Sequence, residues 1–246
     1  MSARRALIAG LGLIGGSIGL ALRRRGWHVA FFDSNPDLDP GEAADQRVAS
    51  LDADADVVIL ATPVDVAVRL LASLHAPLTT SVCSVMSPLR AIADDRFVAG
   101  HPLAGCAERG IAAARADLFE GATWFIDRDD ATIRELIAAC GANAELVDAA
   151  EHDHAVALTS HLPQILSTAL AAYLHAQNAD LRFAGPGLRT FLRLAGSEAS
   201  VWSPIIEANR ENLRPHAGAI ADIVRAIVEG DASSSFASAN EFFAKL

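Results

Sequence analysis

The chain of 246 residues carries little positive charge. Lysine and arginine number 20 against 30 aspartates and glutamates, which gives a formal net charge of −10 at pH 7. Nucleic acids and anionic membrane surfaces attract basic proteins, so we expect neither as a partner. An anionic substrate would have to be bound by a few locally placed arginines.

Cysteines and long apolar runs are also scarce. Cys83, Cys106 and Cys140 are scattered and form no C-x-x-C pair, which predicts three reduced thiols in a cytoplasmic protein. We identify no apolar run of the roughly 18 charge-free residues that a membrane span needs, so no membrane contact is expected. Hydrophobic residues make up 52% of the chain, enough for the cores of one large domain or two smaller ones.

A glycine-rich turn is the most informative feature that is present. An apolar run at 6–9 leads into Gly10, Gly12 and Gly15, which have G-x-G-x-x-G spacing, and a helical pattern follows. In such a unit Gly10 permits the turn, Gly12 lets the backbone approach a pyrophosphate, and Gly15 lets helix and strand pack closely. The N–H groups at the helix start would hold the phosphates. The sequence thus predicts a dinucleotide site; the alternative is a glycine-rich loop without a ligand.

An acid at the end of the next predicted strand, 29–32, indicates which dinucleotide is bound. Asp33 has the spacing from the glycines that is expected for a carboxylate on the ribose. It would accept hydrogen bonds from the ribose hydroxyls and repel a 2′-phosphate, which favours NAD over NADP. The residues predicted to bind the cofactor are Gly10, Gly12, Leu13, Ile14, Gly15, Asp33, Thr62 and Pro63.

Strand and helix patterns alternate up to residue 148, and only helix patterns follow. After Asp33 the predicted strands are 56–61, 81–83, 97–100, 122–126 and 145–147, and the predicted helices are 64–74, 108–116 and 131–140. The alternation is typical of a Rossmann-like doubly wound α/β domain, placed at 1–148. An all-α domain at 149–246 is predicted from helices at 151–176, with a kink or boundary at Pro163, and at 188–195, 201–213, 216–228 and 235–245.

The all-α domain is rich in alanine and leucine. An apolar helical domain beside a nucleotide domain often forms a dimer interface. The alternative is a helical cap that is buried only against its own α/β domain. We favour a homodimer through the helical domain.

Two polar side chains follow predicted strands, Ser84 and His101. Ligands of doubly wound folds sit at the carboxyl ends of the strands. A histidine at that edge can act as a general base because its ordinary pKa lies near neutrality, and Ser84 could orient it. A single histidine is nevertheless more often a structural hydrogen-bonding residue.

The second half supplies further candidates. Arg189 and Arg193 lie four residues apart and are predicted to share a helix face. They either pair with acids or bind a substrate carboxylate, and we favour a carboxylate for one of them. His152, His154 and His161 suggest a metal, but no cysteine or acid joins them at ligand spacing, so no metal site is expected.

Six motifs follow one another along most of the chain. They are G-L-G-L-I-G-G-S at 10–17, H-P-L-A-G at 101–105, A-D-L-F-E-G-A-T-W at 116–124, H-D at 152–153, S-H-L-P at 160–163, and the series Arg193, Trp202 and Asn209-Arg210-Glu211. Together they resemble the motifs of the prephenate and arogenate dehydrogenases of tyrosine biosynthesis. The resemblance implies NAD-dependent oxidative decarboxylation of prephenate to 4-hydroxyphenylpyruvate, of arogenate to tyrosine, or of both.

The same resemblance implies roles for individual residues. His101 is the expected catalytic base, Ser84 its hydrogen-bond partner, and Arg193 the ligand of a substrate carboxylate. Ser160 and His161 would line the substrate pocket, next to Gln164.

Three positions depart from the family pattern. Met86 stands where the serine loop usually has a lysine, Ala107 where an acid is common, and Gln164 where a histidine is common. Because the Gln164 carbonyl can accept a hydrogen bond from an ammonium, we expect arogenate to be accepted at least as well as prephenate. No chorismate mutase segment precedes the glycines and no regulatory domain follows, so a single-activity enzyme is expected.

Two other functions remain open. One is another Rossmann oxidoreductase with a helical domain, of the imine or β-hydroxyacid reductase type. It lacks its usual catalytic lysine signature here and leaves H-P-x-A-G and S-H-L-P unexplained. The other is a non-catalytic sensor that binds NAD without turning over a cyclohexadienol.

Overall fold

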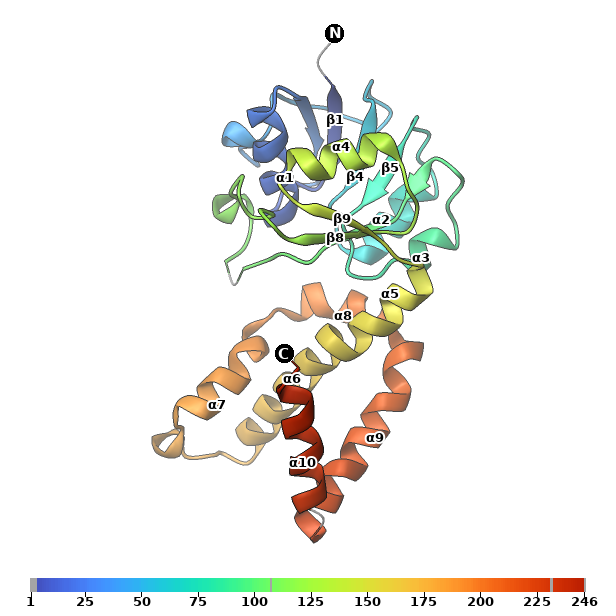
Figure 1. Ribbon diagram of the computed structural model, residues 1–246. Helices are drawn as coiled ribbons and strands as arrows, with labels where there is room; N and C mark the ends of the chain where they lie inside the picture. The colour runs from blue at the N-terminus through green and yellow to red at the C-terminus, as the bar shows by residue number, and fades with distance from the viewer. Residues whose placement is uncertain (1–3, 107, 231, 246) are drawn as a thin grey trace. The chain divides into compact units, whose positions relative to one another are not determined.

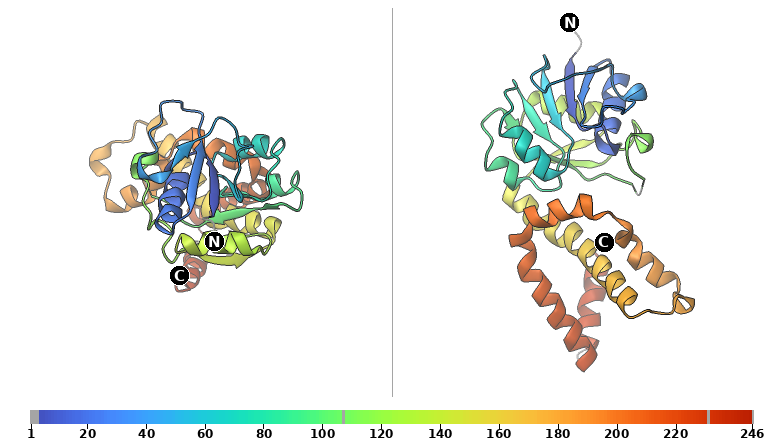
Figure 2. Two further views of the ribbon diagram at one scale, coloured as in Figure 1. Left: turned by 90° about the horizontal axis from the view of Figure 1, so that it is seen from above. Right: turned by 180° about the vertical axis from the view of Figure 1, so that it is seen from behind.

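The computed structural model describes residues 4–106, 108–230 and 232–245. They divide into two compact units, shown as ribbons in Figures 1 and 2. The sheet unit comprises the chain up to Ala155 together with Ser197–Ala208, and the helical unit comprises Val156–Gly196 and the chain from Asn209 onward. A stretch from the second half of the sequence therefore packs with the first half. The division into domains after residue 148 stays a prediction.

The main sheet of the sheet unit has six parallel strands in the order β3-β2-β1-β4-β5-β6. They are β1 (Arg5–Ala9), β2 (His28–Phe32), β3 (Gln46–Arg47), β4 (Val57–Leu60), β5 (Thr79–Ser81) and β6 (Phe97–Val98). All four residues of β4 are buried, as expected for a strand of a parallel sheet covered on both faces. The strand order reverses between β1 and β4, and ligands of such folds bind at the carboxyl ends of the strands at this point. The predicted Rossmann-like fold is confirmed.

A second, three-stranded sheet follows, made of β7 (Gly100–Pro102), β8 (Thr123–Ile126) and β9 (Asn143–Leu146). β7 is antiparallel to β8, and β8 is parallel to β9. The single strand predicted at 97–100 is thus two strands in two sheets. The break lies at Ala99, whose N–H donates to the Asp127 carboxylate at 2.8 Å, while Arg90 binds the same carboxylate. These contacts fix the corner at which the chain leaves the first sheet.

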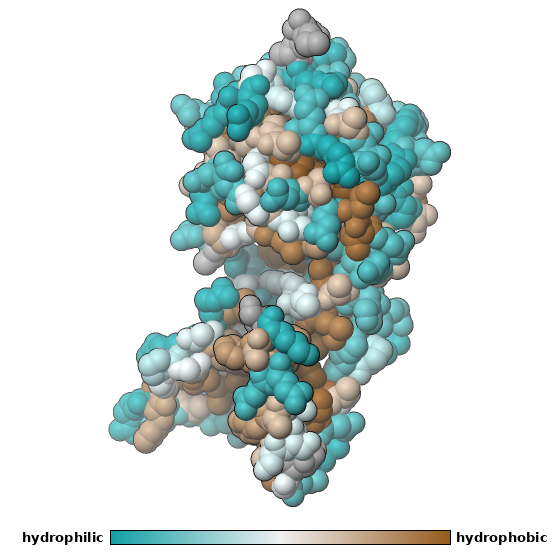
Figure 3. Space-filling view, viewed as in Figure 1, coloured by the Kyte–Doolittle hydropathy of each residue, from teal (hydrophilic) through white to brown (hydrophobic). Residues whose placement is uncertain are grey.

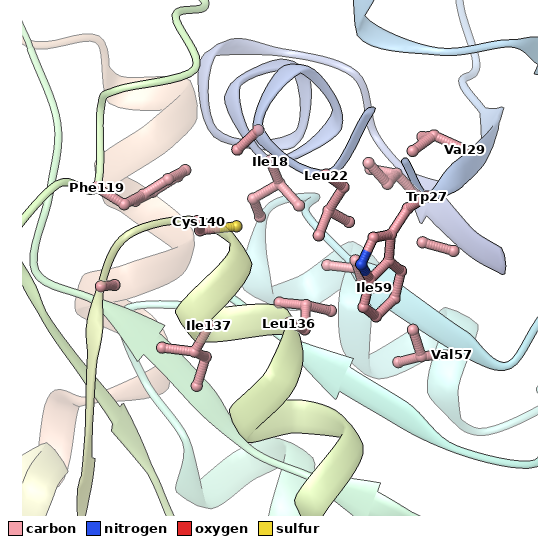
Figure 4. Packing of buried hydrophobic residues seen from close by; sticks show 14 of the residues in the cluster. Ile18, Leu22, Trp27, Val29, Val57, Ile59, Phe119, Leu136, Ile137 and Cys140 are labelled. Atoms are coloured by element: carbon pink, nitrogen blue, oxygen red, sulfur yellow. The ribbon is translucent and has the colours of Figure 1, made fainter. Parts of the chain in front are cut away.

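The described residues of the sheet unit form the helices α1 (Leu13–Arg24), α2 (Val64–Leu71), α3 (Ser87–Arg90), α4 (Ala131–Ala139), α5 (Ala149–Val156) and α8 (Ala199–Ala208). Of the helix predicted at 108–116, only the short 3₁₀ segment Ile111–Ala113 forms. Two apolar clusters cover the sheet, and successive residues of β1 point into different ones, Leu7 into one and Ile8 into the other. Figure 4 shows part of the Ile8 cluster, with side chains of α1, α4 and the strands packed together.

The helical unit contains α6 (Leu162–Ala176), α7 (Pro186–Phe191), α9 (Arg210–Glu229) and α10 (Ala232–Phe243). A π-helical segment, Ala157–His161, directly precedes α6. The predicted kink or boundary at Pro163 corresponds to the junction between this π-helical segment and α6, because Pro163 lies in the first turn of α6. Proline has no N–H for an i−4 carbonyl and its ring displaces that carbonyl, and a wider turn accommodates both effects.

One helical run, Ala149–Ala176, has the length and composition of a membrane span, with a mean hydropathy of 1.2 over an 18-residue window that is 33% buried. This finding differs from the prediction that the sequence holds no such run. Polar side chains interrupt the run. Several of them are buried within the protein: His152, Asp153, His161 and Gln164. The core helix of a soluble protein meets the same criteria, so length and composition alone do not make this a membrane helix.

The three cysteines are free. Cys83 and Cys140 are buried, and burial raises the pKa of each thiol to about 12. Both are therefore protonated and unreactive near neutral pH. A cytoplasmic location stays a prediction from the cysteine usage.

Candidate functional site

Two glycines of the fingerprint are required by the fold itself. Gly10 has a φ of +90°, and its N–H donates to the Phe32 carbonyl at 2.8 Å. A Cβ atom on Gly10 would lie 2.7 Å from the Ala61 carbonyl oxygen. A Cβ atom on Gly15 would lie 2.0 Å from the Gly10 carbonyl oxygen. The start of α1 is thus pressed against the turn, as the spacing predicted.

Gly12 differs from these two. Its backbone is extended, with φ −84° and ψ −152°, and a Cβ atom there would meet nothing within 4 Å. Neither conformation nor packing therefore demands glycine at this position. Gly12 caps α1, whose first turn contains no acidic residue, and the half-buried Leu13 and Ile14 follow it. The open space in front of positively polarised N–H groups fits the pyrophosphate of a dinucleotide.

Asp33 lies against the same turn. One carboxylate oxygen accepts the Leu11 N–H and the other accepts the Asn35 N–H, each at 2.9 Å. A carboxylate has about four acceptor positions, so two remain for ribose hydroxyls. Thr62 adjoins Gly10, because its Cγ2 would be 2.9 Å from a Cβ there, and Pro63 caps α2. The predicted cofactor residues therefore gather at the carboxyl ends of β1, β2 and β4.

Arg47 also comes to this edge, which the sequence did not indicate. One guanidinium nitrogen donates to the Asp33 carbonyl at 3.1 Å, and the other donates to the Asn35 carbonyl at 2.9 Å. The guanidinium carbon lies 4.6 Å from the centre of the Phe31 ring. The residue lies on β3, a strand of two exposed residues without an apolar pattern, and only the folded structure brings it near Asp33.

His101 lies on β7 and is half-buried. Its Nδ1 atom is 2.9 Å from Nε2 of His152 on α5, and the two rings meet edge to face at 89°. His152 is 2% exposed. Ser84 is half-buried in the loop between β5 and α3, and its contact with His101 stays a prediction.

Asp153 continues this chain of polar groups. One of its oxygens lies 2.9 Å from Nδ1 of His152, and the carboxylate accepts the backbone N–H groups of Met86 and Ser87 at 2.8 Å each. Burial alone would raise the pKa of Asp153, but the hydrogen bonds from His152, Met86 and Ser87 outweigh it and hold the pKa below its ordinary value. The Met86 side chain is fully buried in the core. Ala107, the second departure, lies outside the described residues.

The helical unit holds a second buried histidine. His161, at the end of the π-helical segment, is 0% exposed, and its Nδ1 lies 3.0 Å from Nδ2 of Asn209. The other end of that amide, Oδ1, accepts a hydrogen bond from Asn212 at 2.8 Å. The Asn209 NH₂ group therefore faces His161, which assigns a lone pair to Nδ1 and the proton to Nε2. Ser160, its neighbour, is exposed.

Gln164 binds the turn that carries Arg193. Its Nε2 donates to the Leu194 carbonyl at 2.8 Å and to Thr168 Oγ1 at 3.1 Å. The predicted helix at 188–195 is in fact α7 followed by a 3₁₀ segment, Leu192–Gly196, so the shared helix face predicted for Arg189 and Arg193 is not kept. Arg193 is exposed and has no ion-pair partner among the described residues.

Comparisons with known proteins give one family for both parts of the chain. Residues 18–149 match the family model described as "Prephenate dehydrogenase, nucleotide-binding domain", and residues 148–237 match "Prephenate dehydrogenase, dimerization domain". A probable prephenate dehydrogenase of Streptomyces niveus is 33% identical over 94% of this chain and 71% of its own length. A prephenate dehydrogenase of Bacillus subtilis is 31% identical over 84% of this chain and 64% of its own length. The chain spans about two thirds of the length of these curated relatives.

A solved structure shows the same fold. The prephenate dehydrogenase of A. aeolicus, in complex with hydroxyphenyl propionate and NAD⁺, is 25% identical and has a TM-score of 0.83, with 100% of this chain and 96% of that chain covered.

Proposed function

Because the chain belongs to the prephenate dehydrogenase family, we propose that it is an NAD-dependent dehydrogenase that oxidises and decarboxylates prephenate, arogenate or both. One observation of the structure carries this proposal. A histidine that is linked to a buried carboxylate, His101, lies in the same compact unit as a dinucleotide-binding turn. A base beside a hydride acceptor is what alcohol oxidation requires.

NAD⁺ supplies the hydride acceptor when it is bound. The turn from Gly10 to Gly15 would hold its pyrophosphate, and Asp33 would bind its ribose. The carboxylate at this position favours NAD over NADP.

The substrate ring carries a hydroxyl group on the carbon opposite a carboxylate. His101 removes the hydroxyl proton while a hydride leaves the same carbon, which converts the alcohol into a ketone. The carbon–carboxylate bond then breaks, CO₂ leaves, and the electron pair of that bond enters the ring, so that the carbonyl oxygen becomes a phenolate. The phenolate takes up a proton to give the phenol. Aromatisation makes the reaction effectively irreversible. A general base contributes typically ~10²–10⁴-fold to such a step, and the positioning of the reacting groups contributes further.

The helical unit supplies the groups proposed to bind the substrate. Arg193 offers an exposed guanidinium that can bind a carboxylate with two parallel hydrogen bonds. His161 offers Nε2–H as a donor, because Asn209 assigns the lone pair to Nδ1. Ser160 offers a hydroxyl group beside it.

Gln164 supports a further proposal about substrate choice. Its Nε2 donates to Thr168 and to the Leu194 carbonyl within the protein, and the carbonyl oxygen of the same amide is a hydrogen-bond acceptor. That oxygen accepts a hydrogen bond from the ammonium of arogenate, whereas the keto group of prephenate has no hydrogen to donate. We therefore propose that arogenate is accepted at least as well as prephenate.

The surface of the helical unit supports a homodimer. Large apolar side chains are exposed on α6, α9, α10 and the loops between them: Tyr173, Leu181, Phe183, Ile223, Val224, Val228, Phe236, Phe242 and Phe243. Figure 3 shows hydrophobic surface over these helices. An exposed apolar patch of this kind marks an interaction site, and the dimerization model covers most of it.

One assay tests the proposed reaction. Purified protein is mixed with NAD⁺ and with prephenate or arogenate, and NADH formation is followed by absorbance. We expect turnover, with kcat/KM for arogenate equal to or above that for prephenate. A tenfold or greater preference for prephenate, ~1.4 kcal/mol of transition-state discrimination, would overturn the proposal about substrate choice. NAD binding without NADH formation from either substrate would instead indicate a sensor.

A further inference from the structure

His101, His152 and Asp153 form a continuous chain of hydrogen-bonding groups within the sheet unit. Each contact between neighbouring side chains measures 2.9 Å. The far end of the chain is fixed, because the Asp153 carboxylate is 1% exposed and accepts two backbone N–H groups of the loop before α3. A carboxylate held in this way remains ionised near neutral pH and can only accept hydrogen bonds.

When both imidazoles are neutral, an acceptor at one end determines the proton positions along the chain. Asp153 accepts from His152, so Nδ1 of His152 carries its proton. In the neutral imidazole, Nε2 of His152 is then an acceptor. That acceptor faces His101, so Nδ1 of His101 carries its proton and the lone pair of His101 is on Nε2.

We propose that His152 and Asp153 are positioning residues that hold His101 in the tautomer with its lone pair on Nε2, the form that can receive a proton. The catalytic meaning of this statement rests on the function proposed above, whereas the tautomer itself does not. No proton needs to move along the chain. When Nε2 of His101 takes the proton, Nδ1–H strengthens its hydrogen bond to His152, and the dipoles and charge behind it stabilise the cation.

Contacts within the sheet unit contribute to the electrostatics of this chain of groups. Asp153 and His152 come from α5, and the strand neighbour of His101, Phe125 on β8, is apolar and lies edge to face against His152. A carboxylate behind His152 stabilises the protonated form of His101. Its removal would therefore make His101 a weaker base.

A purely structural role is the competing explanation. In that case the three residues only satisfy buried polar groups and attach α5 to the loop that contains Met86 and Ser87. Their substitution would lower stability but would leave the tautomer of His101 and the pH dependence of the reaction unchanged.

The first experiment reads the tautomer without any substrate. Long-range ¹H–¹⁵N spectra of the full chain with ¹⁵N-labelled histidine distinguish a protonated from an unprotonated ring nitrogen. The His101 signals are assigned by their loss in His101→Gln. We expect a protonated Nδ1 and an unprotonated Nε2 in the wild type. A His101 ring with its proton on Nε2 would overturn the proposal.

The second experiment uses matched variants and the pH profile of kcat/KM. His152→Phe keeps a ring of similar size but removes both nitrogens, and we expect a loss of about 10- to 100-fold, by analogy with the partners that orient metal-binding histidines. The acid limb should shift to lower pH, because the protonated form of His101 is no longer stabilised. His152→Gln, which keeps an acceptor oxygen, should recover part of the loss. His75→Phe, on an exposed loop of the same unit, is the control and should leave both quantities unchanged.

The charge is tested by itself with Asp153→Asn, which should shift the acid limb in the same direction. Glu151→Gln removes one charge from an exposed position of the same helix and should have no effect. Unshifted acid limbs in both His152→Phe and Asp153→Asn would overturn the proposal, and if either variant does not fold, the wild-type tautomer and His152→Gln decide it. A wild type that shows the expected tautomer but no NADH formation would contradict the proposed function and leave the tautomer assignment standing.

Discussion

The sheet unit and the helical unit differ in what they bury. The sheet unit contains two clusters of buried apolar side chains, one on each face of the main sheet. Among the described residues of the helical unit, four apolar residues are buried, Val156, Ala157, Leu162 and Leu213, and so are four polar residues, His161, Gln164, Ser167 and Asn209. Many of the large exposed apolar side chains also belong to this unit.

This difference indicates that the two units are stabilised in different ways. The sheet unit has the apolar burial that a self-sufficient fold requires. The helical unit uses its interior for hydrogen bonds that orient His161 and the turn of Arg193, so its apolar residues remain at the surface. In the proposed homodimer, burial of these residues by a second copy of the chain would add stability.

The largest expected effect tests whether the chemistry belongs to the sheet unit. We expect His101→Asn to lower kcat by ~10²–10⁴-fold, because the proton acceptor is removed. NAD binding, measured by calorimetry, and the melting temperature should stay near the wild-type values. A variant with a near-normal kcat would exclude His101 from the mechanism.

A pair of phenylalanines tests the difference in burial. Phe119 is 0% exposed in the sheet unit and Phe183 is 85% exposed in the helical unit. Phe119→Ala should lower the free energy of unfolding by ~3–5 kcal/mol, whereas Phe183→Ala should change it by less than ~0.5 kcal/mol in the monomer. Urea unfolding can follow each unit separately, because all three tryptophans lie in the sheet unit and Tyr173, the single tyrosine, lies in the helical unit. Equal losses would contradict the comparison.

Two arginines test the binding role assigned to the helical unit. Arg193→Gln should raise KM by an amount equivalent to up to ~1.5–3 kcal/mol, the value of a hydrogen bond to a charged group. Cofactor binding should not change. Arg189→Gln is the matched control from α7. A large rise of KM in Arg189→Gln without one in Arg193→Gln would show that Arg189, and not Arg193, binds the carboxylate.

The smallest expected effect concerns the cofactor. We expect kcat/KM for NAD⁺ to exceed that for NADP⁺ by about tenfold or more, which corresponds to ~1.4 kcal/mol. Asp33→Asn keeps an acceptor for the Leu11 N–H but loses the charge, so it should reduce this preference. Asp37→Asn, an exposed acid nearby, should not. Equal use of both cofactors by the wild type would show that Asp33 does not face the ribose.

The sequence predicted the parts of the fold whose patterns are local. The glycine spacing and the apolar run of β4 identified the parallel sheet, because burial on both faces leaves a continuous apolar pattern. The sequence did not predict β3, which has only two exposed residues, or the break at Ala99, which depends on Asp127 and Arg90. Hydrogen bonds between distant residues leave no periodic signal.

The candidate site was predicted unevenly for the same reason. Single residues that follow predicted strands, such as His101 and Asp33, could be found from their positions, although His101 itself lies inside the short strand β7. The contact of His101 with His152 could not, because 51 residues separate them. A local signal did exist: His152 and Asp153 belong to a run of four polar residues, 151–154, between alanines on a helix, and any of them that is buried needs a partner.

The open space at Gly12 bears on how the protein tolerates mutation. Gly12→Ala meets no steric obstacle, so a chain with this substitution should fold, escape proteolysis and accumulate normally while it excludes a pyrophosphate. Such a substitution would separate the loss of cofactor binding from the loss of folding. Gly10→Ala and Gly15→Ala could not be of this class, because at those positions the added methyl group collides with the backbone and the protein itself is lost.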